Sequence, residues 1–361
     1  MNLTIIIPTL EIGGAQNLIL YLAPYLQKNF SLKIIVFKKV YSEIEKQLEK
    51  LGFPIISLNV SLRSPLAIFK LRRIIKDSDV IHTHLFPANY YTVLANIGIK
   101  KPIVYTEHST HNKRRDHKIL RPLERFIYKK FERIVSISDA TKLKLDNWLL
   151  MNSIKKRNIV IENGIDIEKI NSTKVPSLQE IFGRNGIPLL MISRFTESKD
   201  HETVIKALKE ITDSRVFLVF AGDGETKQRN IDLVKNLNLE DRVIFLGNRR
   251  DIPEIIKSSK IGIQSSHWEG FGLTAIEMMA GGLPVIASDV CGLADVVKDA
   301  GILFEKGNHK KLAQNIMEIL NNPTLYTTLQ TSGYQRAKKY SIENTAKNYQ
   351  FLFEDIKNNQ L

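Results

Sequence analysis

Residues 265–277 of the chain read SSHWEGFGLTAIE. They follow the apolar run 261–263, which is typical of a parallel strand buried on both faces. Two glycines, Gly270 and Gly272, then lead into a helix that is predicted to begin near Leu273. Free backbone amides at a helix start, with no Cβ atom in the way, form a binding site for an anion. We therefore expect an anionic ligand at this turn.

Two glutamates frame the turn. Glu269 precedes it, and Glu277 lies in the first turns of the helix. A carboxylate repels phosphate but accepts hydrogen bonds from sugar or ribose hydroxyls. The alternative interpretation is a simple turn followed by a solvated Glu277. The presence of both glutamates around the glycines favours a binding site.

Short apolar runs alternate with helical patterns along the whole chain. This order predicts βα units, right-handed crossovers and parallel sheets. Two series of about six strands predict an α/β protein with two Rossmann-like, doubly wound domains. The expected strands are residues 3–7, 32–37, 55–58, 80–82, 103–105 and 134–137, followed by 189–192, 217–221, 243–246, 261–263, 284–287 and 301–304.

An Asn-Gly turn and a polar stretch over residues 163–173 predict the boundary between the domains. The first domain is expected at residues 1–165 and the second at 166–341, with a last helix, 342–357, packing back on the first. Ligands of open α/β sheets bind at the carboxyl ends of the strands. Two such domains predict a substrate cleft between them.

Composition excludes several classes of protein. Of 361 residues, 43% are hydrophobic and 25% are charged, as in an ordinary globular protein. Cys291 is the single cysteine, which excludes a disulfide framework and a cysteine-rich zinc site. No apolar run reaches the roughly 18 residues that cross a bilayer, and none resembles a signal peptide. We expect a soluble, reduced, cytoplasmic protein.

The positive charge of the chain is unevenly distributed. Residues 1–170 contain 28 Lys and Arg against 15 Asp and Glu, a net charge of +13, whereas residues 171–361 contain 24 against 23, a net charge of +1. Such asymmetry favours a polyanionic partner for the first half, either nucleic acid or an anionic membrane surface. The alternative is a basic, solvated surface with no specific partner.

The motifs resemble, as an ordered set, the retaining glycosyltransferases of family 4, the group 1 transferases of the GT-B architecture. The hallmark of that family is two glutamates separated by seven residues around a Gly-Phe-Gly turn, which Glu269 and Glu277 match. Further matches are Gly13-Gly14-Ala15, Thr106-Glu107-His108, Asn163-Gly164-Ile165-Asp166, Ser193-Arg194-Phe195 with Lys199, Ala221-Gly222-Asp223-Gly224 and Phe245-Leu246-Gly247.

The resemblance implies transfer of a hexose from a UDP- or GDP-sugar to a hydroxyl of a lipid-linked or cell-envelope polysaccharide acceptor, of the capsule, O-antigen or exopolysaccharide type. It also implies attack on the face that the leaving group departs from, with retention of configuration and with neither metal nor cofactor. An epimerase acting on nucleotide sugars, or a phosphorolytic enzyme of the same architecture, is the alternative.

Several matched positions also have a chemical role of their own. Arg194 and Lys199 follow a strand end, where two cations can neutralise the diphosphate of a nucleotide sugar; in another context they would be surface residues. The resemblance implies that His108 and Glu269 contact the donor sugar and that Glu277 holds the ribose. The predicted catalytic residues are His108, Arg194, Lys199 and Glu269. The predicted donor-binding residues are Gly13, Gly14, Arg194, Lys199, Gly247, Asp251, Glu269, Gly270, Phe271, Gly272, Leu273 and Glu277.

Basic residues gather around residues 113–133. The apolar side chains of this helical segment are expected in the core, and its basic face is expected to meet anionic headgroups, each cation adding about 1 kcal/mol at most. This predicts a protein that is peripheral on the inner face of the cell membrane. The residues predicted for the acceptor or membrane side are His84, Lys113, Arg114, Arg115, Arg121 and Arg125.

Nucleic-acid binding and metal binding are both disfavoured. The basic segments are not expected to carry interleaved, exposed aromatic residues on a recognisable nucleic-acid-binding fold, so we expect no nucleic-acid partner. Asp77-Ser78-Asp79 matches a metal-binding pattern, but it precedes a strand, at the end away from the expected site. His82 and His84 lack a third zinc ligand at a plausible spacing. We expect no metal.

Overall fold

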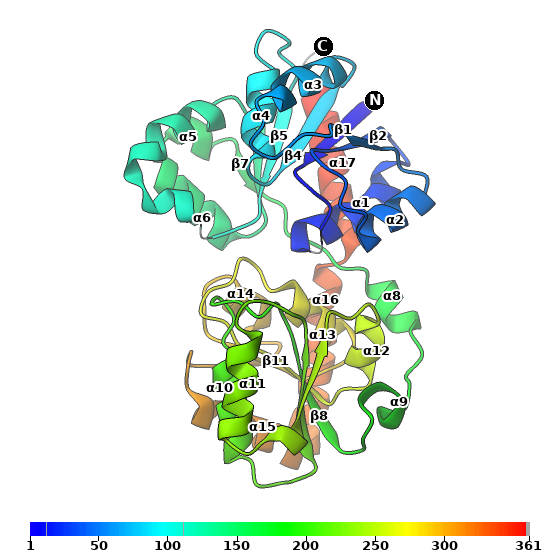
Figure 1. Cartoon of the computed structure of the whole chain (residues 1–361), viewed down its shortest axis with the longest axis vertical. Coiled ribbons are helices and arrows are strands. Elements are labelled where there is room, and N and C mark those ends of the chain that lie inside the picture. The colour runs from blue at the N-terminus through cyan, green and yellow to red at the C-terminus, as the bar shows by residue number, and fades with distance from the viewer. Residues whose placement is uncertain (12, 111, 359–361) are drawn as a thin grey trace. The chain divides into compact units, whose positions relative to one another are not determined.

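The computed structural model describes residues 1–11, 13–110 and 112–358. The chain divides into two compact units (Figure 1). Unit 1 comprises Met1–Gly164 and the segment that begins at Ile342, and unit 2 comprises Ile165–Ser341. The division lies next to the predicted boundary at residues 165 and 166. Each unit is described by itself.

Unit 1 is built on a seven-stranded parallel sheet in the order β3-β2-β1-β4-β5-β6-β7. The order reverses direction between β1 and β4, as in a doubly wound fold. The strands are β1 (Asn2–Ile7), β2 (Ser31–Val36), β3 (Ile55–Ser57), β4 (Val80–His84), β5 (Ile103–Glu107), β6 (Arg133–Ser136) and β7 (Asn158–Val160).

Helices cover both faces of the unit 1 sheet, because successive side chains of a buried strand point to opposite faces. The helices are α1 (Gly14–Leu26), α2 (Glu43–Lys50), α3 (Leu66–Ile75), α4 (Ala88–Ala95), α5 (Arg121–Tyr128), α6 (Asp139–Leu149), α7 (Asn152–Lys155) and α17 (Ile342–Asn358). Ile5 packs into a core with α1, α2 and α17, whereas Ile6 packs into a second core with α3 to α7. The last helix, α17, contacts α1 and β4 (Figure 1).

Unit 2 repeats the doubly wound arrangement with a six-stranded parallel sheet in the order β10-β9-β8-β11-β12-β13. The strands are β8 (Ile187–Ile192), β9 (Val216–Ala221), β10 (Val243–Gly247), β11 (Ile261–Gln264), β12 (Val285–Ser288) and β13 (Ile302–Phe304). The helices are α8 (Ile167–Ser172), α9 (Leu178–Phe182), α10 (His201–Glu210), α11 (Lys227–Asn236), α12 (Ile252–Lys257), α13 (Leu273–Ala280), α14 (Leu293–Val297), α15 (His309–Asn321) and α16 (Pro323–Lys339).

The two-sheet α/β prediction is confirmed, although several details differ. The short strand β7 was not predicted, because its three residues sit at the edge of the sheet and two of them are only half-buried. Strands β4 and β5 run two residues further than predicted, to His84 and Glu107. Among the described residues, no helix has both the length and the apolar character needed to span a bilayer.

Candidate functional site

The sheet of unit 2 has a topological switch point between β8 and β11. Ligands of open α/β sheets bind outside the carboxyl ends of the strands at such a point. The segment that leaves β8 carries Arg194 and Lys199, and the segment that leaves β11 carries Glu269. The fold thus brings these predicted residues to the same edge of one sheet.

Lys199 and Glu269 form an ion pair at this edge. Lys199 Nζ donates to a carboxylate oxygen of Glu269 and lies 3.3 Å from Ser266 Oγ. The two charged side chains are only 16% and 19% exposed. The segments are joined by a backbone hydrogen bond of 2.8 Å from His267 N to Ser198 O. Because shielding from water strengthens such a pair, both charges are held in a defined place.

Helix α13 begins beside this pair. Its N-cap, Gly272, has φ +102°, and a Cβ atom there would lie 2.8 Å from Leu293 Cδ1. Gly270 N donates to Glu269 Oε1 at 3.0 Å. The first amides of a helix have no acceptor within the helix. Glycine at position 272 therefore serves both the sharp turn and the close packing of Leu293. The amides that follow it are candidates to bind an anion.

The ring of Phe271 is part of the core. It is 4% exposed and packs against Tyr340, with the ring centroids 5.4 Å apart. Phe271 was predicted among the donor-binding residues. Because the ring is buried, only the backbone of Phe271 could contact a ligand at the turn.

Arg194 is exposed, on a segment that passes close to the loop after β9. A Cβ atom on Gly222 would lie 2.0 Å from Ser193 O, and one on Gly224 would lie 2.3 Å from Phe195 O. Both glycines also have positive φ values, +141° and +154°. Only glycine fits at these two positions, so this loop sets the path of the segment that carries Arg194.

Gly247 is the last residue of β10, and Asp251 lies in the loop that follows it. Gly247 has φ +67°, and its carbonyl accepts a hydrogen bond of 2.8 Å from Gly222 N. Arg249 Nε donates to Asp251 at 2.7 Å, and this bond lowers the pKa of the carboxyl group. The carboxylate of Asp251 is therefore already engaged by a neighbouring cation. The role of these residues in donor binding stays a prediction.

The switch point of unit 1 lies between β1 and β4. Gly13 is the N-cap of α1 and Gly14 is its first residue. His84 is the last residue of β4, and His108 follows the end of β5. The predicted residues of unit 1 are thus also found where strands end or a helix begins, at the edge of the sheet where ligands bind.

His84 does not line an acceptor site, contrary to prediction. Its side chain is fully buried, and its Nδ1 lies 2.9 Å from His108 Nε2. The alternation of strand residues sends His84 to the face of the sheet that α17 covers, rather than to the surface. His82, which precedes it on the same face, is also buried.

Arg114 and Arg115 are not free to meet headgroups, again contrary to prediction. The side chain of Arg115 is only 9% exposed and forms an ion pair with Glu107. Arg114 donates to the buried carboxylate of Glu124 at 3.3 Å, and its guanidinium lies 3.9 Å from the ring centroid of Phe86. Both arginines neutralise buried carboxylates. The side chain of Lys113 lies outside the described part of the structure.

Arg121 and Arg125 also turn toward the protein. The Arg121 guanidinium lies 4.6 Å from the ring centroid of Trp148, and Arg125 Nε donates to Leu149 O at 2.7 Å. Both contacts join α5 to α6. The four arginines predicted for the membrane side therefore hold this part of unit 1 together.

Two family models match the chain. Residues 12–169 match the model described as Glycosyltransferase Family 4, and residues 179–336 match the model described as Glycosyl transferases group 1. The first match begins after β1 and covers most of the rest of unit 1, and the second covers most of unit 2 with its switch point. The chain belongs to the group 1 glycosyltransferases.

Similar proteins support this membership. A Campylobacter jejuni transferase named as adding α-1,4-linked N-acetyl-D-galactosamine to a diphosphoundecaprenol-linked glycan is 25% identical, over 99% of both chains. An Escherichia coli α-1,3-galactosyltransferase, named for UDP-Gal and GlcNAc-diphosphoundecaprenol, is 28% identical over 75% of this chain and 73% of its own. HepE of Anabaena, solved with UDP and glucose, has a TM-score of 0.84 and 20% identity, covering 98% of this chain and 99% of its own. The fold is that of GT-B glycosyltransferases, and this group 1 glycosyltransferase acts on a nucleotide sugar.

Two residues of the glycosyltransferase that support the site were not predicted. Ser266 contacts Lys199, as described above, and Gly292 supports the loop of Glu269. A Cβ atom on Gly292 would lie 2.7 Å from Glu269 O, and its φ is +87°. The position of Gly292 shortly after a predicted strand was the one signal in the sequence that could have indicated this role.

Burial raises the pKa of Glu277 to about 7, although the charge of Lys169 opposes the shift. If Glu277 accepts hydrogen bonds from ribose hydroxyls, the bound form must be ionised, and binding lowers its pKa. Affinity should therefore fall as the pH drops below 7, because the free protein then holds a proton that binding must release.

We expect the Kd for a UDP-sugar to rise about tenfold between pH 8 and pH 6 in the wild type. Calorimetry measures this, and a UDP-sugar is preferred to UDP because its diphosphate does not titrate near pH 7. The isosteric variant Glu277→Gln has no carboxyl group to titrate, so its Kd should be flat. A pH-independent wild type would remove Glu277 from the ribose site.

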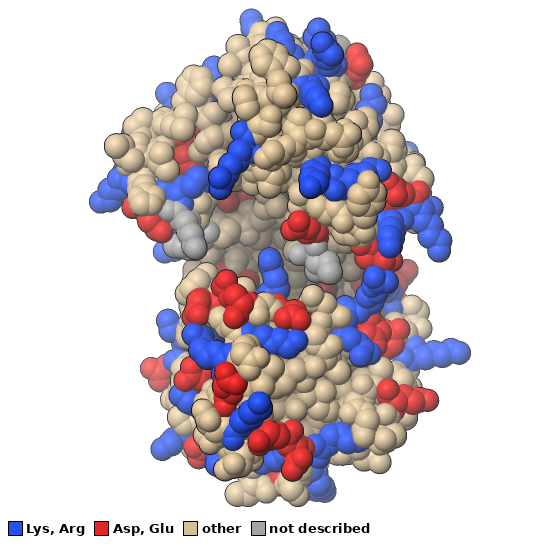
Figure 2. Space-filling view, viewed as in Figure 1, with Lys and Arg blue, Asp and Glu red and all other residues tan. Residues whose placement is uncertain are grey.

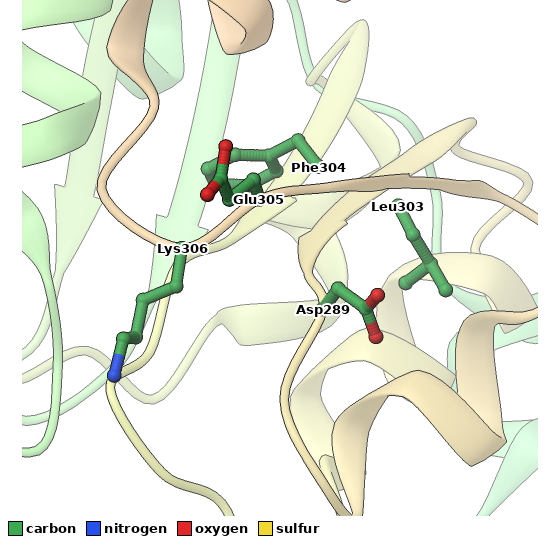
Figure 3. A pocket seen from close by; sticks show the side chains of 5 residues that line it. All are labelled: Asp289, Leu303, Phe304, Glu305 and Lys306. Carbon is green, nitrogen blue, oxygen red and sulfur yellow. The ribbon is translucent and has the colours of Figure 1, made fainter.

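A separate hollow of about 300 Å³ lies where β12 and β13 end (Figure 3). It is lined by Asp289, Leu303, Phe304, Glu305 and Lys306. Two carboxylates against one ammonium disfavour an anionic ligand, so this hollow does not fit a diphosphate.

Proposed function

We propose that the chain is a retaining, metal-independent hexosyltransferase, which moves a hexose from a UDP- or GDP-sugar to a hydroxyl of a lipid-linked cell-envelope glycan. The observation that carries this proposal is the Lys199–Glu269 pair beside the start of α13. Lys199 and Arg194 supply positive charge to the donor diphosphate, which is the task that a metal ion would otherwise perform. Glu269 accepts hydrogen bonds from the sugar.

In the proposed reaction, the bond between the anomeric carbon and the diphosphate oxygen breaks. The acceptor oxygen bonds to that carbon on the same face, and its proton passes to the departing diphosphate. Arg194, Lys199 and the amides at the start of α13 stabilise the negative charge that develops on the leaving group. This charge is present only as the bond breaks, so the interactions favour the transition state.

The relatives support the proposed class of acceptor. The Campylobacter jejuni and Escherichia coli transferases are both named for undecaprenol-linked substrates. The net charge of +13 over residues 1–170 fits an acceptor presented at an anionic membrane. These points support our proposal that the enzyme is a peripheral protein on the cytoplasmic face of the membrane.

A transfer assay tests the proposal. UDP- and GDP-hexoses are each incubated with the protein and an undecaprenyl-diphosphate-linked glycan, and the anomeric configuration of the product is read by NMR. We expect one donor to be used, with retention, and with the same turnover in excess EDTA. Conversion of the donor without acceptor would indicate an epimerase instead, and an inverted product would contradict the mechanism.

Exposed apolar residues, rather than the four arginines, support membrane contact. Ile119, Leu123 and Phe126 form an apolar rim along α5 and the turn before it, and they are 86%, 49% and 46% exposed. The exposed cations nearby are Lys118, Lys129 and Lys130. In Figure 2, unit 1, the upper part of the view, has broad uncharged areas with basic side chains around them. Apolar side chains that insert among headgroups, flanked by lysines, are typical of an interfacial helix.

We expect the triple variant Ile119→Ser, Leu123→Ser and Phe126→Ser to bind anionic vesicles at least about tenfold more weakly, because it loses apolar area for insertion. Co-sedimentation with vesicles measures the binding. The control is Phe351→Ser on α17, where a side chain that is 74% exposed lies outside the rim. Unchanged binding of the triple variant would exclude the rim as the contact.

A further inference from the structure

Four polar side chains of unit 1 lie together on the face of its sheet that α17 covers. Strands β4 and β5 are parallel neighbours in a register that pairs His84 with Thr106. Residues two apart on a strand share a face, so His82 joins His84, and His108 follows Thr106 on the same side. His82 Nε2 lies 2.7 Å from Thr106 Oγ1, and His84 Nδ1 lies 2.9 Å from His108 Nε2.

The rings of this cluster are held firmly. The His84 ring packs on the His82 ring, with centroids 4.0 Å apart. His82 packs in turn on Tyr349 and Phe353 of α17, at 5.1 and 5.3 Å. His84 therefore cannot turn its ring without disturbing the core beneath α17.

Both histidines of the His84–His108 pair are neutral. Burial lowers the pKa of His108 to about 3 and the pKa of His84 well below its ordinary value. A neutral imidazole has one N–H and one lone pair, so their hydrogen bond joins the N–H of one ring to the lone pair of the other. Two arrangements are possible. If His84 Nδ1 donates, His108 accepts at Nε2 and carries its proton on Nδ1. If His108 Nε2 donates, His108 carries its proton on Nε2 and His84 carries its own on Nε2.

The second nitrogen of His84 distinguishes the two arrangements. His84 Nε2 is buried and has no hydrogen-bond partner among the described residues. If it carried the proton, a buried N–H would be left unsatisfied, which is rarer and costlier in folded proteins than an unused lone pair. The proton of His84 therefore belongs on Nδ1, from which it is donated to His108 Nε2.

We infer that His84 is a positioning residue, which fixes His108 in the tautomer that carries its proton on Nδ1. This inference rests on the proposed function, in which His108 meets the donor sugar. His108 is half-buried at the end of β5, and in this tautomer its remaining nitrogen is a hydrogen-bond donor. It thus offers an N–H to an oxygen of the sugar. The wrong tautomer would offer a lone pair there instead.

Two substitutions of His84 test the inference by kinetics. His84→Leu removes the donor, and we expect kcat/KM for transfer to fall about tenfold to a hundredfold, as when other orienting partners of a functional histidine are lost. The amide of His84→Asn places an N–H near the position of Nδ1 and should restore most of the loss. The affinity for UDP should be unchanged in both variants, because UDP lacks the sugar that His108 is proposed to meet.

Tyr349→Phe is the matched control. It alters the same buried cluster, since the Tyr349 hydroxyl lies 3.0 Å from Thr106 Oγ1, but it leaves the His84–His108 bond in place. We expect it to lower stability without lowering transfer. If Tyr349→Phe and His84→Leu reduced transfer equally, the effect of His84 would be structural and the inference would be wrong.

The tautomer can also be observed directly. In protein labelled with ¹⁵N-histidine, the signals of His108 are assigned by their loss in His108→Gln. We expect Nδ1 to be protonated and Nε2 to be unprotonated in the wild type and in His84→Asn, and this pattern to be lost in His84→Leu. A proton on Nε2 of His108 in the wild type would overturn the inference.

Failure of the inference can be separated from failure of the proposed function. Full transfer activity in His108→Ala would remove His108 from the active site, and the proposed role of His108 would fail. Loss of transfer in His108→Ala, together with wild-type kinetics in His84→Leu, would overturn only the role of His84.

Discussion

Replacing Lys199 with alanine is expected to lower kcat/KM for sugar transfer by about 10²- to 10³-fold, the usual loss when one preorganised group that stabilises transition-state charge is removed. The ammonium lies at the switch point of unit 2, where it is bonded to Glu269 and close to Ser266. Its side chain is only 16% exposed, so bulk water does not readily replace it.

The stability of unit 2 should fall modestly in this variant, because the Glu269 carboxylate loses its partner but is still 19% exposed. The charges of Lys199 and Glu269 lie at the edge of the sheet, and the loops that carry them are joined by backbone hydrogen bonds. Lys199→Arg keeps the charge but changes its shape, so we expect partial activity. We therefore expect kcat/KM to be highest in the wild type, lower in Lys199→Arg and lowest in Lys199→Ala, which is the order expected for an electrostatic role.

A lysine from a comparable ion pair provides the control. Lys206 pairs with Glu202 on α10 at 2.6 Å, but the two side chains are 42% and 49% exposed, and neither residue was predicted to bind the donor. Lys206→Ala should transfer sugar at the wild-type rate. Wild-type kcat/KM in Lys199→Ala would exclude Lys199 from the reaction and would weaken the case for a metal-independent diphosphate site.

Replacing Glu124 with alanine is expected to destabilise unit 1 by about 3–5 kcal/mol, because it leaves the partners of a buried carboxylate without their acceptor. The Glu124 side chain is fully buried in α5. It accepts hydrogen bonds from Trp148 Nε1 at 2.6 Å, from Tyr90 OH at 3.0 Å and from Arg114 Nε at 3.3 Å. One carboxylate thus joins α4, α5, α6 and the turn of Arg114.

The expected fall in the melting temperature of unit 1 is roughly 6–20 °C, at about 2–4 °C per kcal/mol for a unit of this size. Trp148 reports the transition, because it contacts Glu124 directly and the only other tryptophan, Trp268, lies in unit 2. Measuring tryptophan fluorescence in a Trp268→Phe background therefore isolates unit 1.

Two comparisons make this measurement specific. Glu124→Gln keeps the size of the side chain and some of its hydrogen bonds, so its loss should be intermediate. Glu132→Gln removes a carboxylate that is 50% exposed and paired with Arg133, and it should change stability by less than about 1 kcal/mol. If Glu124→Ala had the same melting temperature as Glu132→Gln, the buried network would have no role in stabilising unit 1.

The network around Glu124 also explains why the basic segment was misread from the sequence. A count of charges records Arg114, Arg115, Arg121 and Arg125 as cations, but it does not record which of them meet a buried acceptor. Glu107 lies 8 residues from Arg115, and Glu124 lies 10 residues from Arg114. Neither spacing is the three or four residues that would predict an ion pair along one helix. The apolar residues were misread for the same reason, because the helix that buries Ile127 exposes Leu123 and Phe126.

The order of strands and helices, by contrast, follows from periodicity within short windows of the chain. Strands buried on both faces are continuous apolar runs, and the runs at residues 189–192 and 217–221 coincide with β8 and β9 to within two residues. The same local reading placed Arg194, Lys199 and Glu269 just beyond strand ends. Because parallel strands share one carboxyl edge, the location of the site in unit 2 could be predicted as well.

Contacts between distant segments exist only in the folded chain. Lys199 reaches Glu269 across 70 residues, and His84 reaches His108 across 24. Periodicity predicts that each of these residues lies at or beyond the end of a strand. Which side chains touch depends on the register of neighbouring strands and on the helix that covers them. The chain's own pattern therefore specified two doubly wound sheets and the edges that carry function, whereas packing alone paired the charges of unit 2 and buried His84 behind His108.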